Sequence, residues 1–113
     1  MKFRLSALAL LLASPAFAEG ELKVYHWFEY IPQELVDKFT AETGIAVTID
    51  TYDSNESMLA SLKAGKLGQY DVAVPADFMV QIMGQEGMLD TFTPEEMPNF
   101  GNIAPQWVDV PFD

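Results

Sequence analysis

One short stretch near the start of the chain places three aromatic rings around a single carboxylate. It reads HWFEYIP over residues 26–32, and its central residues are Trp27, Phe28, Glu29 and Tyr30. These residues suit an organic cation, because the carboxylate offsets the charge and a ring face attracts a cation by roughly 0.5 to 2 kcal/mol. The same residues also suit a corner of the core, with Glu29 complementing the dipole of the helix that follows. The stretch is therefore a candidate cation site with a structural alternative.

The first eighteen residues have the layout of a secretory signal peptide. Lys2 and Arg4 precede an apolar run over residues 5–13, and the small-x-small pattern AFA ends at Ala18. The apolar run is shorter than the ~20 residues that a membrane-spanning helix needs. We therefore expect cleavage after Ala18, export to the periplasm and no stable membrane insertion afterwards.

The composition of the part expected to be exported excludes disulfides and a lipid anchor, and it disfavours anionic partners. The chain contains no cysteine, so neither a disulfide nor a lipid-anchored N-terminal cysteine is available. Seventeen acidic residues stand against four lysines once residues 1–18 are removed. Such a field disfavours nucleic acid and anionic lipid and concentrates cations, although many exported proteins are acidic merely because this keeps them soluble.

Residues 19–90 alternate between strand-like and helix-like patterns. Short runs rich in β-formers or alternating in polarity predict strands, and apolar stripes at helical spacing predict helices that end near glycines. Asp53, Ser54 and Asn55 offer caps for the second helix, and the mostly apolar third strand predicts burial on both faces. We expect strands over 23–28, 45–52 and 70–74, and helices over 32–43, from about 55 to 65, and from 77 onward.

This βαβαβα order predicts an α/β fold with a mainly parallel sheet. In such sheets ligands bind beyond the carboxyl ends of the strands, where the loops lead into the helices. The rule brings residues 27–31, 52–55 and 75–78 to one edge of the sheet. The opening stretch therefore lies where this architecture would form a binding site.

Residues 91–113 differ from the rest of the chain. They hold four of the seven prolines and show neither helical nor strand periodicity, yet they include Phe100, Trp107 and Phe112. Rings of this size are unusual in a disordered tail. Either they pack back onto the sheet or they await cover from protein beyond this chain. We expect an irregular segment leading toward a missing remainder.

Several motifs in order resemble one known family. They are the turn at residues 27–30, FTAETGI at the end of the first helix, DSNES at 53–57 and YDVAVP at 70–75. Together with the NFGNIAPQWVDVPFD tail, they resemble the N-terminal portion of the periplasmic spermidine/putrescine-binding proteins of bacterial polyamine ABC importers. The resemblance implies a periplasmic-binding-protein type II-like fold, of which this chain is part of the first of two lobes. It also implies a polyamine ligand held between the lobes, an inner-membrane ABC permease as partner, a monomer, no cofactor and no catalysis.

The resemblance assigns roles in the first turn. Trp27 would form a wall of the ligand slot, Glu29 would pair with an ammonium group, and Tyr30 would add a ring face or a hydroxyl. Phe28 stands where relatives commonly carry Ser or Thr, so a hydroxyl hydrogen bond is lost there.

It also assigns ligand contacts to Ala76, Asp77 and Phe78. Ala76 falls where relatives often carry a serine and Phe78 where they often carry a tyrosine, which makes this edge more apolar. Because of these two differences, the preferred amine cannot be copied from a relative. Without the resemblance, Phe78 would be assigned to the core and Asp77 to a helix cap.

Two other functions stay open on the residues alone. Asp50, Asp53, Asp71 and Asp77 could hold Mg²⁺ for a hydrolase of doubly wound fold, although Asp71 is expected at the opposite end of its strand. A binding protein of the same architecture could also take another solute. A lone histidine, His26, is a weak sign of a metal site and is expected to belong to sheet packing.

Overall fold

The computed structural model describes residues 20–112. The predicted signal peptide lies outside the described residues. Within them, no helix is long and apolar enough to cross a membrane.

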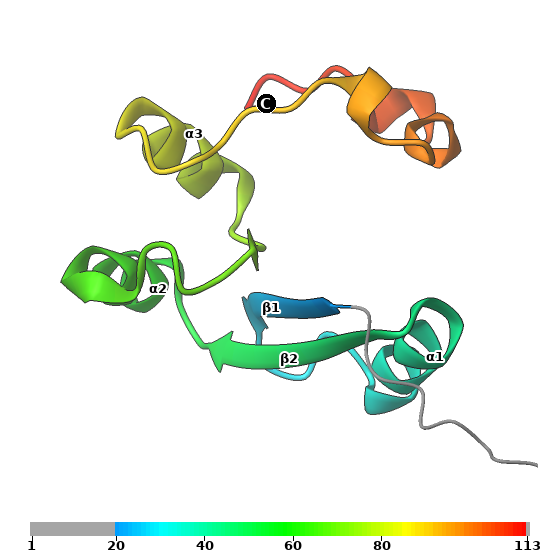
Figure 1. Ribbon diagram of the computed structural model, residues 1–113. Coiled ribbons are helices and arrows are strands. Elements are labelled where there is room, and N and C mark those ends of the chain that lie inside the picture. The colour runs from blue at the N-terminus through cyan, green and yellow to red at the C-terminus, as the bar shows by residue number, and fades with distance from the viewer. Residues whose placement is uncertain (1–19, 113) are drawn as a thin grey trace, which may run out of the picture.

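Three parallel strands form the sheet, in the order β2-β1-β3 (Figure 1). They are β1 Gly20–Trp27, β2 Ile45–Tyr52 and β3 Val72–Ala73, and the long pair runs in register from Gly20 and Ile45 to Trp27 and Tyr52. The expected α/β class with a parallel sheet and βαβαβα order is confirmed.

The strand predictions need two corrections at the outer parts of the sheet. β1 begins three residues before the expected start, because its pairing with β2 extends to Gly20. The third strand pairs over two residues, and Val72 is 43% exposed instead of buried on both faces. The reason is its position, since β3 is an edge strand among the described residues and has β1 as its one neighbour.

Three α-helices follow the strands, and local signals explain where they begin and end. They are α1 Gln33–Thr43, α2 Asn55–Ser61 and α3 Asp77–Gln85. Gly44 ends α1 as predicted, with a left-handed φ of 72° that a glycine adopts without a steric cost. Ser54 caps α2 by accepting a hydrogen bond from the Ser57 amide at 3.1 Å. A wide π-type turn, Leu62–Lys66, continues α2 to the expected end.

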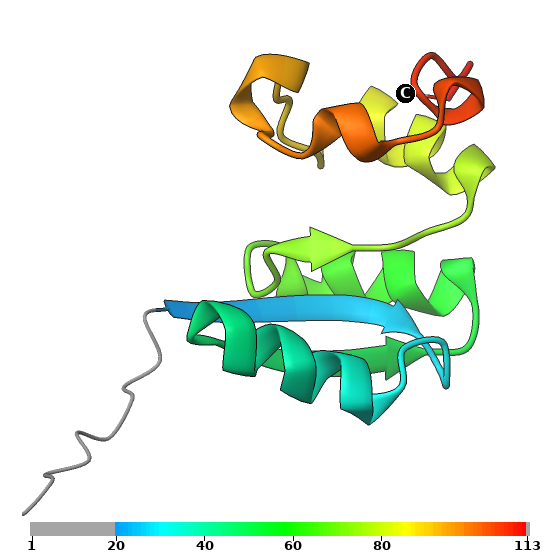
Figure 2. The same ribbon diagram turned by 90° about the vertical axis from the view of Figure 1, so that its right-hand side faces the viewer.

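The helices lie on both faces of the sheet, with α1 on one face and α2 on the other (Figure 2). α3 lies above the sheet on the α2 side (Figures 1 and 2). The main core fills the space between the sheet and these two helices, and its members are Tyr25, Tyr52, Met58, Leu62, Met79 and Met83. Packing of α3 into this core fixes the helix whose first turn carries part of the candidate site.

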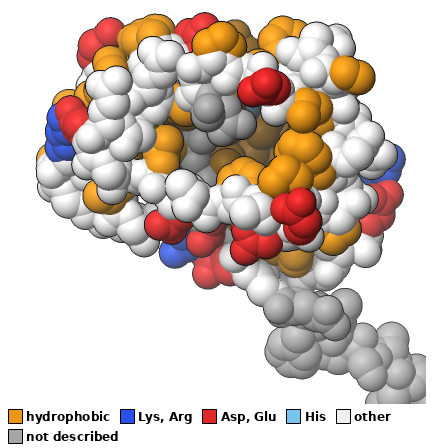
Figure 3. Space-filling model, turned by 90° about the horizontal axis from the view of Figure 1, so that it is seen from above, with side chains coloured by type: hydrophobic (Ala, Val, Ile, Leu, Met, Phe, Trp, Pro, Cys, Tyr) orange, Lys and Arg blue, Asp and Glu red, His pale blue; other side chains and the backbone are white. Residues whose placement is uncertain are grey.

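Residues 91–112 run beside α3 and contain three short 3₁₀ turns, Pro94–Glu96, Phe100–Asn102 and Pro105–Trp107 (Figures 1 and 2). The Gln81 side-chain amide donates to the Pro111 carbonyl at 3.3 Å. α3 and this segment line a groove that includes Phe100 and Phe112, and the view from above shows apolar side chains around a hollow (Figure 3). Trp107 stays 64% exposed, so this ring is not packed onto the sheet.

Candidate functional site

The loops at the carboxyl ends of the three strands meet at one edge, which we call the rim and define as residues 27–31, 52–55 and 74–78. The Phe28 amide donates to the Tyr52 carbonyl at 3.2 Å, which joins the first loop to the second. The Tyr52 hydroxyl donates to the Val74 carbonyl, and the Ala76 amide donates to the Asn55 side-chain oxygen at 3.0 Å. The second loop is therefore tied to both others.

Trp27 is the rim residue of the first loop that packs against the core. Its ring packs against the core cluster and lies 4.8 Å from the ring of Tyr52, yet the residue is half-buried and not sealed inside. The structural and the ligand-binding interpretations of Trp27 are thus compatible, because one face of the ring can pack while another part stays open.

Glu29 and Tyr30 project from a tight turn. Glu29 has φ 59°, a left-handed conformation that is uncommon for residues other than glycine. Both residues are exposed, Tyr30 by 71%, and the Tyr30 ring lies 5.7 Å from that of His26. The acidic residue in the first turn of α1 is Glu34. Glu34 is thus better placed than Glu29 to complement the helix dipole, whose effect falls off within one turn.

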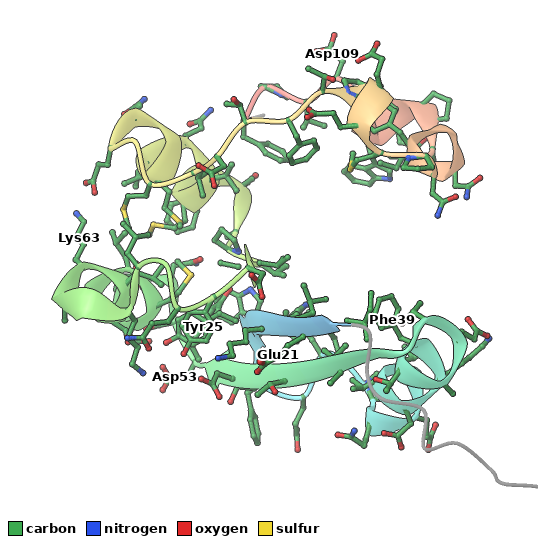
Figure 4. All side chains as sticks on the ribbon, in the orientation of Figure 1. Glu21, Tyr25, Phe39, Asp53, Lys63 and Asp109 are labelled. Atoms are coloured by element: carbon green, nitrogen blue, oxygen red, sulfur yellow. The ribbon has the colours of Figure 1, made fainter. Side chains whose placement is uncertain are left out.

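Phe28 occupies the outer side of the first loop. It is 65% exposed and lines a shallow hollow together with residues from the end of β2 and from α2. Asp53, at the β2 end of that hollow, accepts a hydrogen bond from the Ser57 hydroxyl at 3.0 Å, and Figure 4 shows it beyond the end of β2 near α2. Phe28 therefore presents an apolar ring next to a carboxylate.

The third loop delivers Ala76, Asp77 and Phe78 at the start of α3. Ala76 is the N-cap residue, and Asp77 is the first residue of the helix, where its carboxylate accepts from the Phe78 amide at 2.7 Å. The interpretation of Asp77 as the capping residue is therefore wrong by one position. The expectation from the residues alone that Phe78 is a core residue is also wrong, since it is 48% exposed. The buried residues of α3 are Met79 and Met83 instead.

The rim segments carry acidic residues and no basic ones. Glu29, Asp53 and Asp77 come from the three loops, one from each. Three of the four lysines of the described chain pair with carboxylates on other parts of the molecule, namely Lys23 with Glu21, Lys38 with Glu42 and Lys63 with Glu86. A rim of this kind attracts cations and repels anions.

The aspartates proposed for a Mg²⁺ site do not converge. Asp50, within β2, accepts from the Tyr70 hydroxyl at 2.7 Å. Asp71 accepts from the Lys23 amide at 2.7 Å and stands just before the amino end of β3. Among residues 20–112, no group of three or more His, Cys, Asp or Glu side chains is placed to hold a metal ion. The Nδ1 atom of His26 accepts from the Trp27 amide at 2.7 Å, which fits a structural role.

Sequence reasoning missed the parts played by Tyr52 and Asn55 in joining the loops. Tyr52 is 5% exposed, and burial, together with the neighbouring Tyr25, raises its pKa to about 12. Asn55 is 7% exposed and forms the first residue of α2. The sequence signals available are a tyrosine at the last position of a strand and an asparagine in the first turn of a helix. Neither signal predicts which distant residue the side chain will bind.

No family model matches the sequence, whereas individual relatives match clearly. The chain is 44% identical over 108 residues to the spermidine/putrescine-binding periplasmic protein of Salmonella typhimurium, covering 95% of this chain and 31% of that protein. It is 38% identical over 108 residues to the putrescine-binding periplasmic protein SpuD of Pseudomonas aeruginosa, covering 90% of this chain and 29% of that protein. The chain thus spans about a third of the length of the relatives it matches.

A solved structure agrees with these relatives. The spermidine/putrescine ABC transporter substrate-binding protein PotD from Streptococcus pneumoniae superposes with a TM-score of 0.75 at 37% identity, covering 83% of this chain and 29% of that one. The resemblance and the fold class inferred from the sequence are confirmed. The names of the relatives place them in the periplasm, in agreement with the predicted export.

Proposed function

We propose that this chain, which is homologous to part of the spermidine/putrescine-binding periplasmic proteins, supplies one side of a polyamine site in a periplasmic solute-binding protein. The complete protein would hold putrescine or spermidine between two lobes and deliver it to an inner-membrane ABC permease. It would act as a monomer and perform no catalysis. Closure of the lobes around the ligand would be its functional motion.

The acidic rim is the observation that carries this proposal. A polyamine is a series of ammonium groups joined by methylene spacers, so its site needs separated carboxylates and flat apolar walls. Glu29, Asp53 and Asp77 supply one carboxylate from each loop, without a competing lysine or arginine in these loops. The exposed rings of Phe28 and Tyr30 supply apolar surface beside them.

Individual roles follow from the positions of the side chains. Glu29 would pair with a terminal ammonium group, because its carboxylate takes part in none of the three salt bridges within residues 20–112. Trp27 would present its open part as a wall, and Tyr30 would place a ring or a hydroxyl next to the same ammonium. Phe78, with Asp77 and Ala76 at the start of α3, would border the opposite end of the slot.

The test is a titration of the full chain with amines, in which NMR signals are recorded at each amine concentration. Putrescine at millimolar concentration is expected to shift the Trp27 indole signal and the Glu29 and Phe78 amides, while the dianion glutarate is not. Glu29→Gln should reduce the putrescine response. Glu34→Gln is the matched control, because Glu34 is an exposed acid of the neighbouring helix turn outside the rim. Equal responses of the two variants would refute the role of Glu29.

A same-fold protein for another solute is the remaining alternative from sequence. The rim disfavours an anionic solute but would accept other organic cations. Titration with the monoamine butylamine separates these cases, since a polyamine site gains from a second ammonium group. Equal shifts with butylamine and putrescine would favour a general cation site.

A further inference from the structure

We infer that Tyr52 and Asn55 are positioning residues that hold residues 74–76 against the end of β2. They thereby set where the start of α3 stands relative to Trp27. We call the two hydrogen bonds, from Tyr52 to Val74 and from Ala76 to Asn55, the clasp. The two hydrogen bonds of the clasp belong to the observed fold. The effect of the clasp on ligand binding rests on the proposed function.

Tyr52 is connected to both sides of the rim. Its buried ring packs 4.8 Å from the ring of Trp27, and its backbone carbonyl accepts from the Phe28 amide. Its hydroxyl donates to the Val74 carbonyl. One residue thus joins the turn that carries Glu29, through its backbone and its ring, to the segment that leads into α3, through its hydroxyl.

Asn55 provides the second attachment of the same segment. Its buried side chain accepts from the Ala76 amide at 3.0 Å, and Ala76 is the N-cap residue of α3. The backbone amide at an N-cap has no partner inside its own helix, so a side chain from elsewhere can satisfy it. Ala76 is therefore held one residue before Asp77 and two before Phe78.

The clasp matters because β3 gives this segment little other support. β3 pairs over two residues, and the Val74 amide makes the last backbone bond to β1, to the Tyr25 carbonyl at 3.1 Å. From the Val74 carbonyl onward, the hydrogen bonds that join this segment to the rest of the rim, among the described residues, are the two of the clasp. Loss of either bond should let residues 75–78 move away from Trp27.

Tyr52→Phe isolates the hydroxyl, and Tyr25→Phe is the matched control. Both rings belong to the same core and lie 4.9 Å apart edge to face. The Tyr25 hydroxyl is not part of the clasp. In the full chain without ligand, hydrogen exchange of the Ala76 amide is expected to rise about fivefold in Tyr52→Phe, as the loss of about 1 kcal/mol predicts, and to stay unchanged in Tyr25→Phe.

Exchange of the Val24 amide in the β1–β2 ladder distinguishes loosening of the clasp from general unfolding. If Val24 exchange rises as much as that of Ala76, or if Ala76 exchange does not change, the clasp is refuted. Asn55→Ala and Asn55→Asp provide a second test, because Asp keeps the accepting oxygen. Asn55→Asp should keep the Phe78 amide signal near its wild-type position, and Asn55→Ala should not.

The effect of the clasp on ligand binding is tested by the same putrescine titration, monitored by NMR. Tyr52→Phe is expected to weaken the response about fivefold, while Tyr25→Phe leaves it unchanged. A wild-type chain that does not respond even to putrescine far above the ~1 mM expected for an open rim refutes the proposed function, yet the exchange experiment still decides the clasp. A faster Ala76 exchange with an unaltered putrescine response would refute the role of the clasp in ligand positioning.

Discussion

The described chain alone should bind putrescine only weakly, with a Kd no tighter than about 1 mM. The rim side chains that would contact the ligand are open to water, with Phe28 65%, Tyr30 71% and Phe78 48% exposed. Ion pairs and ring contacts in such positions are screened and solvated. Their strength is therefore far below that of the same contacts in a closed site.

The magnitude follows from the contacts that the rim can offer. An exposed ion pair contributes at most about 1 kcal/mol, and an exposed ring contributes about 0.5 to 1 kcal/mol to a cation. Two ammonium groups, each with one carboxylate and one ring, therefore gain about 4 kcal/mol at best, which corresponds to a Kd of about 1 mM. The entropy lost on binding weakens this further.

The assay is isothermal calorimetry of residues 19–113 with putrescine, supported by the NMR titration where heats are too small. On the proposed function, a complete protein with two lobes would bind putrescine far more tightly than residues 19–113 alone. Micromolar affinity of the piece would require about twice the free energy that the exposed rim can supply. That result would refute the idea that the site is completed by the part of the protein beyond this chain.

Three further predictions concern stability and can be checked by urea denaturation. Met83→Ala should reduce the free energy of unfolding by about 2 to 5 kcal/mol, because Met83 is 1% exposed in the core, whereas Leu67→Ala, at a 53% exposed position, should change it by less than about 0.5 kcal/mol. Ser54→Ala should cost about 1 kcal/mol through loss of the α2 cap, and an unchanged stability would contradict the capping geometry. Burial of Tyr52 and the hydrogen bond of Tyr70 to Asp50 raise the pKa of both tyrosines from 10.0 to about 12. The contribution of these two tyrosines to stability should therefore be fully present below pH 10 and be lost between pH 10 and 12, because the unfolded chain ionises first, and the loss should be less steep in Tyr70→Phe.

The elements with strong local signals could be predicted closely from the sequence. β2 has the predicted bounds because its residues alternate in polarity between Gly44 and Asp53. α1 ends where Gly44 can adopt positive φ. Both decisions depend on residues close together in the chain.

The errors arose where distant residues decide the outcome. β3 is an edge strand with β1 as its one neighbour among the described residues, so Val72 is exposed. The sequence of β3 itself does not show that the strand lies at the edge. Phe78 lies in an apolar helix whose core positions are filled by Met79 and Met83, so Phe78 and Ile82 remain outside the core. The Tyr52 to Val74 bond joins residues 22 positions apart, and no local pattern predicts it.

The same distribution of exposure explains how a weak rim could become a strong site. Fixed carboxylates and rings contribute far more once a second surface removes the water between them, because the effective dielectric constant falls. The apolar groove along α3 and the exposed Trp107 show that this chain also leaves hydrophobic surface uncovered on the side away from β2. If the proposed function is right, a domain that keeps its acids and rings at one edge, beside a buried core and side chains such as Tyr52 that join its loops, would gain most of its affinity for a diamine from enclosure of this edge.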